Sequence, residues 1–183
     1  MGFDVEAITA ALSEKLSSSE DNRFYAVVDG ARCVDLAYEA KLVFGKEIRS
    51  LFADDIQPLV WHVAPYLVPI DPGSTYLSRW AERWGQSAGV LIVSASDPDR
   101  LYSHLRKIFV VTDDQRQSFF FRFYDPRVLR NFLETCTRSQ LTELFGPISE
   151  FIVEGVGSEI LSFRCGTDHP STRGEVVSRD PAI

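Results

Sequence analysis

A chain of 183 residues is long enough to form a single domain with its own hydrophobic core. Hydrophobic residues make up 45% of the chain and charged residues 25%, which is typical of a globular protein and argues against wholesale disorder or membrane residence. The 19 basic and 26 acidic residues give a net charge of −7, so we expect neither nucleic acid nor an anionic membrane surface as a partner.

The cysteines and the hydropathy pattern indicate where the protein resides. Cys33, Cys136 and Cys165 are widely spaced and odd in number, which suggests no disulfide framework and favours a reducing compartment. The N-terminal residues lack the basic start and the uninterrupted apolar run of a signal peptide. No apolar run approaches the ~20 residues that span a bilayer. We therefore expect a cytoplasmic protein without a transmembrane segment.

The first half of the chain alternates between predicted helices and strands. Residues 1–22 are predicted to hold a capping helix over residues 4–17, because apolar residues recur there at helical spacing. Apolar residues 24–28 and 66–70 predict two strands, each followed by a helix. Residues 89–93 are apolar at every position, which is typical of a central strand covered on both faces.

The second half contains two helix starts and more strands. Asp97-Pro98 and Asp125-Pro126 both fit the N-cap and first position of a helix. Strands are predicted at residues 109–111, 118–124, 148–153 and 159–164, and a short helix at residues 139–145. The polar residues 166–183 are predicted to be a flexible tail.

Together these elements predict one α/β domain over residues 23–165. Helices follow strands in the first half, whereas neighbouring strands in the second half are joined by short turns. We therefore expect a layered domain with a mixed β-sheet flanked by helices and with antiparallel pairing toward the C-terminus.

A search for catalytic residues finds no convincing constellation. No glycine-rich phosphate loop occurs, and no histidine has a partner at metal-ligand spacing, so we expect neither cofactor nor metal. His104 is predicted to lie on the solvated face of its helix. Ser94 follows a buried strand without a nucleophile-elbow motif, and Cys165 lies four residues before His169 in the predicted tail. A small hydrolase that uses Ser94 or Cys165 remains an alternative hypothesis.

The most distinctive segment, residues 119–127, reads Phe-Phe-Phe-Arg-Phe-Tyr-Asp-Pro-Arg. We interpret it as a buried aromatic strand that ends at a capped helix. Because Arg122 stands among aromatic residues, its guanidinium is expected to need a carboxylate partner. Asp29, at the end of the first predicted strand, and Asp125 are the candidates.

The sequence Arg-Phe-Tyr-Asp-Pro-Arg at residues 122–127, called the 122–127 motif below, matches the hallmark of a known family. The chain resembles the adaptor or chaperone domains of type VI secretion effectors, a family long catalogued as a domain of unknown function. Other family-like segments occur in the expected order at residues 25–30, 50–52, 65–68, 91–94 and 104–106. The resemblance implies a bacterial cytoplasmic protein without catalytic activity. It would bind a secreted effector and help load this toxin onto the valine-glycine-repeat spike protein.

The resemblance does not settle which residues contact a partner. We interpret Arg122, Asp125 and Pro126 of the 122–127 motif, together with Asp29, as structural. The candidates for partner contact are Tyr124, Arg127, Arg130 and Trp61. Trp80 and Trp84 are assigned to the core because they share a helical stripe. An unrelated protein-binding regulatory module is the remaining alternative.

Overall fold

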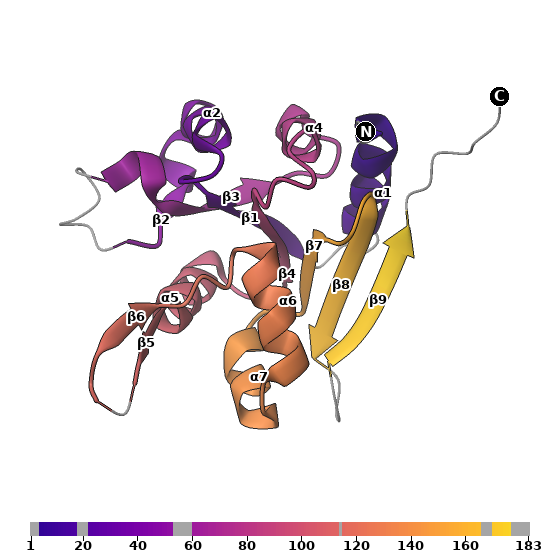
Figure 1. Cartoon of the computed structure of the whole chain (residues 1–183). Coiled ribbons are helices and arrows are strands. Elements are labelled where there is room, and N and C mark those ends of the chain that lie inside the picture. The colour runs from indigo at the N-terminus through magenta and orange to yellow at the C-terminus, as the bar shows by residue number, and fades with distance from the viewer. Residues whose placement is uncertain (1–3, 18–21, 53–59, 114, 166–169, 177–183) are drawn as a thin grey trace.

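The computed structural model describes residues 4–17, 22–52, 60–113, 115–165 and 170–176 (Figure 1). Its main sheet contains the strands β1 (Arg23–Asp29), β2 (Arg49–Ser50), β3 (Pro65–Ile70), β4 (Gly89–Ser94), β7 (Glu150–Glu154), β8 (Glu159–Cys165) and β9 (Pro170–Val176). The strand order in this sheet is β2-β3-β1-β4-β7-β8-β9. A second, two-stranded sheet is formed by β5 (Val110–Thr112) and β6 (Ser118–Phe120).

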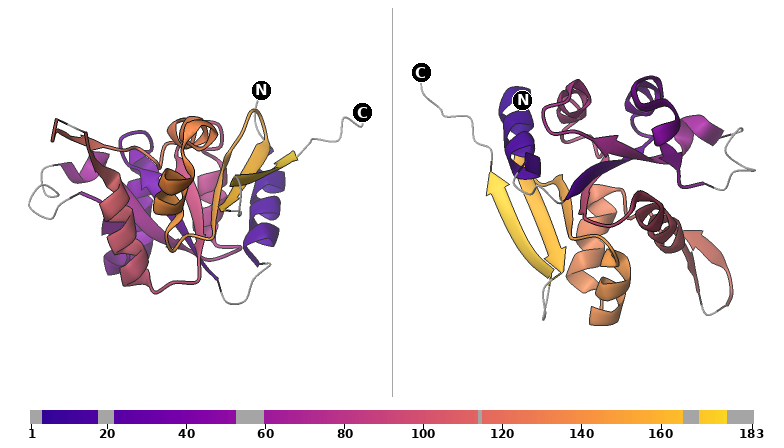
Figure 2. Two further views of the ribbon diagram at one scale, coloured as in Figure 1. Left: turned by 90° about the horizontal axis from the view of Figure 1, so that it is seen from below. Right: turned by 180° about the vertical axis from the view of Figure 1, so that it is seen from behind.

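Helices cover both faces of the main sheet (Figure 2). One face is covered by α1 (Val5–Ser17), α2 (Val34–Phe44) and α4 (Thr75–Ala81). The other is covered by α5 (Pro98–Phe109), α6 (Pro126–Thr135) and α7 (Arg138–Phe145). Two short 3-10 helices, η1 (Gly45–Glu47) and η2 (Trp61–Val63), flank β2 in the chain. The sheet therefore separates two hydrophobic cores.

The pleat of the central strands builds both cores. In β4, Leu91 and Val93 pack on the side of α2 and α4, whereas Val90 and Ile92 pack on the side of α5 and α6. This alternation follows from the two-residue period of a strand. The predicted α/β class with flanking helices is confirmed, and β4 is the middle strand of the sheet, as its uniformly apolar sequence predicted.

The pairing differs from the mixed sheet expected from the sequence. Every strand pair that joins the described residues is antiparallel, in the first half of the chain as well as the second. The strand-helix-strand units are present, but each has another strand between its two members: β3 lies between β1 and β2, and β1 lies between β3 and β4. The sequence predicted a helix after β1 and after β3, but neither β2 nor the strand inserted into each unit.

The predicted helix starts are confirmed in atomic detail. The carboxylate of Asp97 accepts hydrogen bonds from the backbone N–H groups of Asp99 and Arg100, and Pro98 occupies the first turn of α5. The hydroxyl of Ser74 accepts from the N–H of Leu77 at the start of α4. These side chains satisfy donors that have no partner within the helix.

The prediction for the N-terminal end of the chain agrees with the structure, whereas the prediction for the C-terminal end differs from it. The N-terminal helix is present as α1, and it buries Ile8, Leu12 and Leu16 in the core beside α4. The predicted flexible tail is wrong for Pro170–Val176, because these residues form β9 and pair along their length with β8. An edge strand needs only backbone hydrogen bonds, so a polar sequence that begins with proline can form one. The tail's other residues, 166–169 and 177–183, lie outside the described ranges.

No helix in the described part of the chain is long and apolar enough to cross a membrane.

Candidate protein-binding site

The 122–127 motif lies in a turn rather than in a strand. The predicted strand over residues 118–124 ends at Phe120, and both described strands of the hairpin, β5 and β6, are exposed rather than buried. The chain then turns, with the N–H of Asp125 donating to the carbonyl of Arg122 at 3.0 Å. Asp125 begins α6. The prediction failed because aromatic residues favour strands by residue type. Only the first part of this aromatic run is extended, and residue type does not show where the extended part ends.

Arg122 reaches across the fold to the end of β1. Its Nη2 lies 2.6 Å from Oδ2 of Asp29 and 3.7 Å from Oδ2 of Asp125. The other carboxylate oxygen of Asp29 accepts the backbone N–H of Ala31 at 3.0 Å. Both predicted carboxylate partners of Arg122 are therefore confirmed. Asp29 connects the motif with the turn that leads into α2.

Asp125 has two functions in the motif. Its Oδ1 accepts the backbone N–H of Arg127 at 3.1 Å, so it caps α6 as predicted, with Pro126 in the first turn. The Arg127 side chain also binds the carboxylate at both oxygens, with Nε 2.9 Å from Oδ1 and Nη2 2.6 Å from Oδ2. Burial raises the pKa of Asp125, but the hydrogen bonds and charge of Arg127 outweigh it, so the pKa is lowered. Asp125 is therefore an anion at neutral pH.

Arg122 is half-exposed, although the sequence suggested that it lies in a buried strand. The side chains of Asp29 and Asp125 are 1% and 2% exposed, whereas those of Arg122 and Arg127 are 44% and 52% exposed. The acceptors face inward and the guanidinium groups reach the surface. A guanidinium has five N–H donors, so each arginine keeps donors that can bind a carboxylate or carbonyl of a partner.

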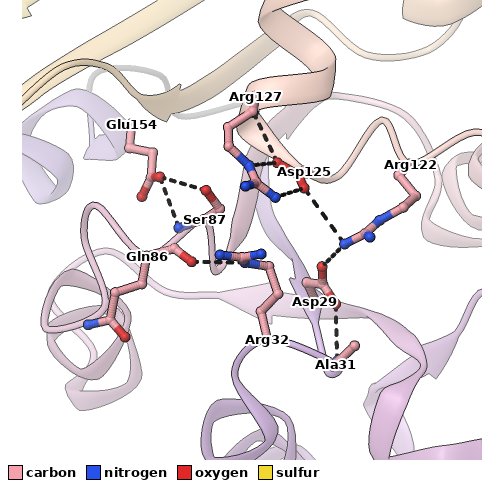
Figure 3. Close-up of polar contacts among 9 residues, drawn as sticks. All are labelled: Asp29, Ala31, Arg32, Gln86, Ser87, Arg122, Asp125, Arg127 and Glu154. Carbon is pink, nitrogen blue, oxygen red and sulfur yellow. Dashed lines mark hydrogen bonds and ion pairs between the residues drawn. The ribbon is translucent and has the colours of Figure 1, made fainter.

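A second group of polar contacts lies beside this network, at the end of β7 (Figure 3). The carboxylate of Glu154 accepts the backbone N–H groups of Gly85 and Ser87 at 2.7 and 2.9 Å, and so holds the turn before β4. The guanidinium of Arg130, on α6, donates to the carbonyl of Glu154. Arg32 donates from Nε to the carbonyl of Gln86 at 3.0 Å. The motif therefore ties the start of α6 to the β1–α2 turn. Glu154 and Arg130 in turn tie the turn before β4 and the α6 helix to the end of β7.

A family model described as "Domain of unknown function (DUF4123)" matches residues 24–143. The chain belongs to this DUF4123 family. No curated protein and no solved structure matches the chain. The matched DUF4123 region includes the 122–127 motif and Asp29, whereas Glu154 and the strands β7–β9 lie beyond it.

Within the DUF4123 region, the candidates for partner contact fall into different environments. Tyr124 is buried, packs against Phe109 and Phe123, and has its pKa raised to about 12 by that burial, so the prediction of an exposed Tyr124 is wrong. Arg127 is half-exposed, as the prediction required. Arg130 is partly buried and bound to the backbone of β7.

Trp61 belongs to an apolar surface that lies mainly on α2. Its ring centroid is 6.5 Å from that of Tyr38, and Nζ of Lys41 lies 4.9 Å from its ring centroid. The row Val34, Tyr38 and Leu42 recurs every four residues on one face of α2, and these side chains are between 51% and 68% exposed. We call Val34, Tyr38, Leu42 and Trp61 the α2–Trp61 face.

Sequence reasoning identified Trp61 but missed the rest of this face. The buried residues of α2 are Leu36, Ala37 and Ala40, whereas Val43 is exposed. A detectable signal was present: α2 has apolar residues around most of its circumference, more than one buried side can use. Apolar residues beyond those that pack into the core indicate a second face of the helix, one that a binding partner covers.

The structure also places the residues of the alternative hydrolase. Ser94 is buried, and its hydroxyl donates to the carbonyl of Pro147 at 2.7 Å and accepts the N–H of Ser96 at 3.1 Å. Cys165 is exposed at the end of β8, and His169 lies outside the described residues. The hydroxyl of Ser94 is therefore engaged by backbone groups of the described residues. In the described part of the chain, no cluster of three metal-ligating side chains occurs.

His104 differs from its prediction as a solvated residue. It is partly buried, and its Nε2 is 2.9 Å from the carbonyl oxygen of Leu144, so the ring joins α5 to α7. Burial lowers the pKa of His104, although its hydrogen bond acts in the opposite direction. The ring also packs closely against Gly146, where a Cβ would lie 2.3 Å from Cε1. His104 therefore has a packing role.

Proposed function

We propose that this chain is a non-enzymatic adaptor of a bacterial type VI secretion system. In the cytoplasm it binds a toxic effector protein and helps load it onto the valine-glycine-repeat spike protein. The α2–Trp61 face is the observation that supports protein binding most directly. The resemblance centred on the 122–127 motif supplies the secretion context, and membership of the DUF4123 family is compatible with it.

The α2–Trp61 face has the composition of a binding surface. Tyr38 and Leu42 expose large apolar area, and Trp61 offers an aromatic anchor, the residue type most enriched at interface hot spots. Exposed apolar residues that are contiguous, rather than scattered, mark interaction sites on soluble proteins. Lys41 lies over Trp61 and adds one positive charge at the rim. A helix or loop of the effector with apolar anchors fits this surface.

The 122–127 motif helps to fix the turn that leads into α2, the helix that carries most of this face. Asp29 holds Ala31 through its carboxylate, and its backbone carbonyl accepts the N–H of Cys33 at 2.9 Å, so it shapes the turn into α2. Arg122 in turn fixes Asp29. The motif is therefore a positioning element for α2, and its half-exposed guanidinium groups keep donors for further contacts.

The test is co-expression with an effector encoded beside this chain, followed by size-exclusion chromatography. We expect one complex, both at low salt and at ~0.5 M salt, because an interface built on apolar anchors resists charge screening. The double variant Tyr38→Ser/Leu42→Ser should lose the complex. Val156→Ser is the matched control, since Val156 is 87% exposed in the β7–β8 turn, away from this face.

Two results would contradict the proposal. Folded effector and folded adaptor that elute separately at both salt concentrations would remove the adaptor function. Reproducible turnover by the purified chain, lost in Ser94→Ala or Cys165→Ala, would support the hydrolase instead. A complex that survives Tyr38→Ser/Leu42→Ser would retain the adaptor function but move the binding site away from the α2–Trp61 face.

A further inference from the structure

The β5–β6 hairpin stands apart from the main sheet (Figure 1). It exposes apolar side chains on both of its faces. Val110, Val111, Phe119 and Phe120 are between 43% and 60% exposed. Val110 pairs with Phe120 and Val111 with Phe119, so each apolar pair occupies a different face. Two short strands are marginally stable on their own, and exposed apolar edges tend to recruit another strand.

The hydrogen bonds of the hairpin define which backbone groups face outward. The N–H of Phe121 donates to the carbonyl of Phe109 at 2.8 Å, and the N–H of Asp113 donates to the carbonyl of Gln117 at 3.0 Å. In an antiparallel pair, bonded positions alternate with positions whose N–H and C=O point away from the partner strand. Val110 and Thr112 occupy these alternate positions, so β5 presents their backbone groups at its outer edge.

An apolar groove of about 600 Å³ runs beside β5. All three residues of β5 line it. The other apolar lining residues are Ile108 of α5, Phe121 directly after β6, Phe132 of α6 and Leu144 of α7. Its rim is polar, with Lys107 paired to Glu143 at 3.3 Å and Gln140 nearby. The groove therefore combines an open strand edge with apolar side-chain space.

We propose that β5 receives an extended segment of a partner protein as a third strand of this small sheet. The backbone groups of Val110 and Thr112 would pair with the segment, and every second side chain of the segment would enter the groove. The fitting segment alternates apolar with polar residues and has no charge at its centre. This site is separate from the α2–Trp61 face and goes beyond the adaptor proposal, since it depends only on the hairpin and its groove.

Two proline variants distinguish the edges of the hairpin. Thr112 and Ser118 are cross-strand partners at an alternate position, so each directs its N–H outward, but toward opposite edges. Proline removes an N–H and is tolerated at a strand edge. Thr112→Pro removes a donor from the β5 edge, while Ser118→Pro makes the matched change on β6. Circular dichroism and thermal unfolding check that both variants remain folded.

The probe is the peptide acetyl-Lys-Thr-Val-Thr-Val-Thr-Val-Lys-amide, titrated into the full chain by isothermal calorimetry. Two further forms carry N-methyl groups on all the Val amides or on all the Thr amides. Successive amides of a strand point to opposite sides, so only one methylated form should lose binding, by about tenfold or more. A bound helix or a nonspecific apolar contact would not produce this difference.

We expect the unmodified peptide to bind wild type and Ser118→Pro alike, and to bind Thr112→Pro about tenfold or more weakly. No binding to wild type at about 1 mM peptide would overturn the proposal. Equal effects of the two methylated forms, or of the two proline variants, would overturn it as well.

Discussion

Arg122 and Asp29 are 93 residues apart in the chain, yet Nη2 of the first lies 2.6 Å from Oδ2 of the second. Arg122→Leu leaves the buried carboxylate of Asp29 without its guanidinium partner, which should cost about 1 to 3 kcal/mol of unfolding free energy. The lower part of this range is expected, because half-exposed Arg122 allows water to reach the gap. Urea titration measures the loss.

Arg127→Leu is the comparison for that prediction. Arg127 contacts Asp125, which keeps its capping bond to the backbone and its proximity to Arg122 after the substitution. The Arg127 variant should therefore be more stable than the Arg122 variant. Equal melting temperatures for the two variants would contradict the assigned roles.

Asp125 is predicted to stabilise the fold through both its capping bond and its charge. Asp125→Ala loses both and should cost about 1 to 2 kcal/mol, whereas Asp125→Asn retains a capping oxygen and should be milder. Secretion of the effector should decrease only as far as folded adaptor decreases. An Asp125→Ala protein with wild-type stability and no secretion would instead place Asp125 in the interface.

The sequence predicted the parts of the fold that depend on local chemistry. The aspartate-proline pairs at residues 97–98 and 125–126 begin helices in the structure, and the apolar run at residues 89–93 is the central strand. The sequence did not predict the strand order. A strand such as β3, which lies between two others in the sheet, leaves no pattern in the sequences of the strands that it separates. Nor did the sequence predict β9, since backbone pairing at an edge requires no apolar pattern.

The candidate site divides in the same way. The pairing of Arg122 with Asp29 and Asp125 followed from the need of an arginine for an acceptor, and it was correct. Arg122 was expected to be buried and is half-exposed, whereas Tyr124 was a candidate for surface contact and is buried. The reason is that the chain turns within the six-residue motif, and composition alone does not show in which direction each side chain points.

His104 predicts a pH dependence of stability. Its pKa is lowered in the folded state by burial, so protonation favours the unfolded chain. The contribution of His104 to the free energy of unfolding is fully present above the unfolded pKa of about 6.5. This contribution is lost as the pH falls through the pKa of His104 in the folded state. Between about pH 7.5 and about pH 5, His104→Gln should lose stability less steeply than wild type. His62→Gln, at an exposed position, is the control, and parallel stability curves for wild type and His104→Gln would contradict the assignment.

Gly89 is predicted to be the least replaceable of the described glycines. Its φ of 149° is unfavourable for other residues, and a Cβ would lie 2.0 Å from the carbonyl oxygen of Val27 in the paired strand β1. Gly89→Ala should therefore cost more than about 3 kcal/mol. Gly157→Ala, with a φ of 65° and open space around it, should cost about 1 kcal/mol from backbone strain alone. Similar denaturation midpoints would disprove this steric account.

Truncation tests whether β9 is part of the folded domain. Ending the chain after Cys165 removes β9 and makes β8 the edge of the sheet, whereas ending it after Val176 keeps all seven paired positions of the two strands. The shorter chain should lose about 1 to 3 kcal/mol, because several backbone hydrogen bonds are lost and each contributes only modestly in water. It should also self-associate more, since β8 would expose unpaired N–H and C=O groups. Urea titration and size-exclusion chromatography of both chains measure these effects. Equal stability and equal elution would show that β9 contributes nothing to the domain, and the polar-tail prediction for residues 166–183 would then be restored.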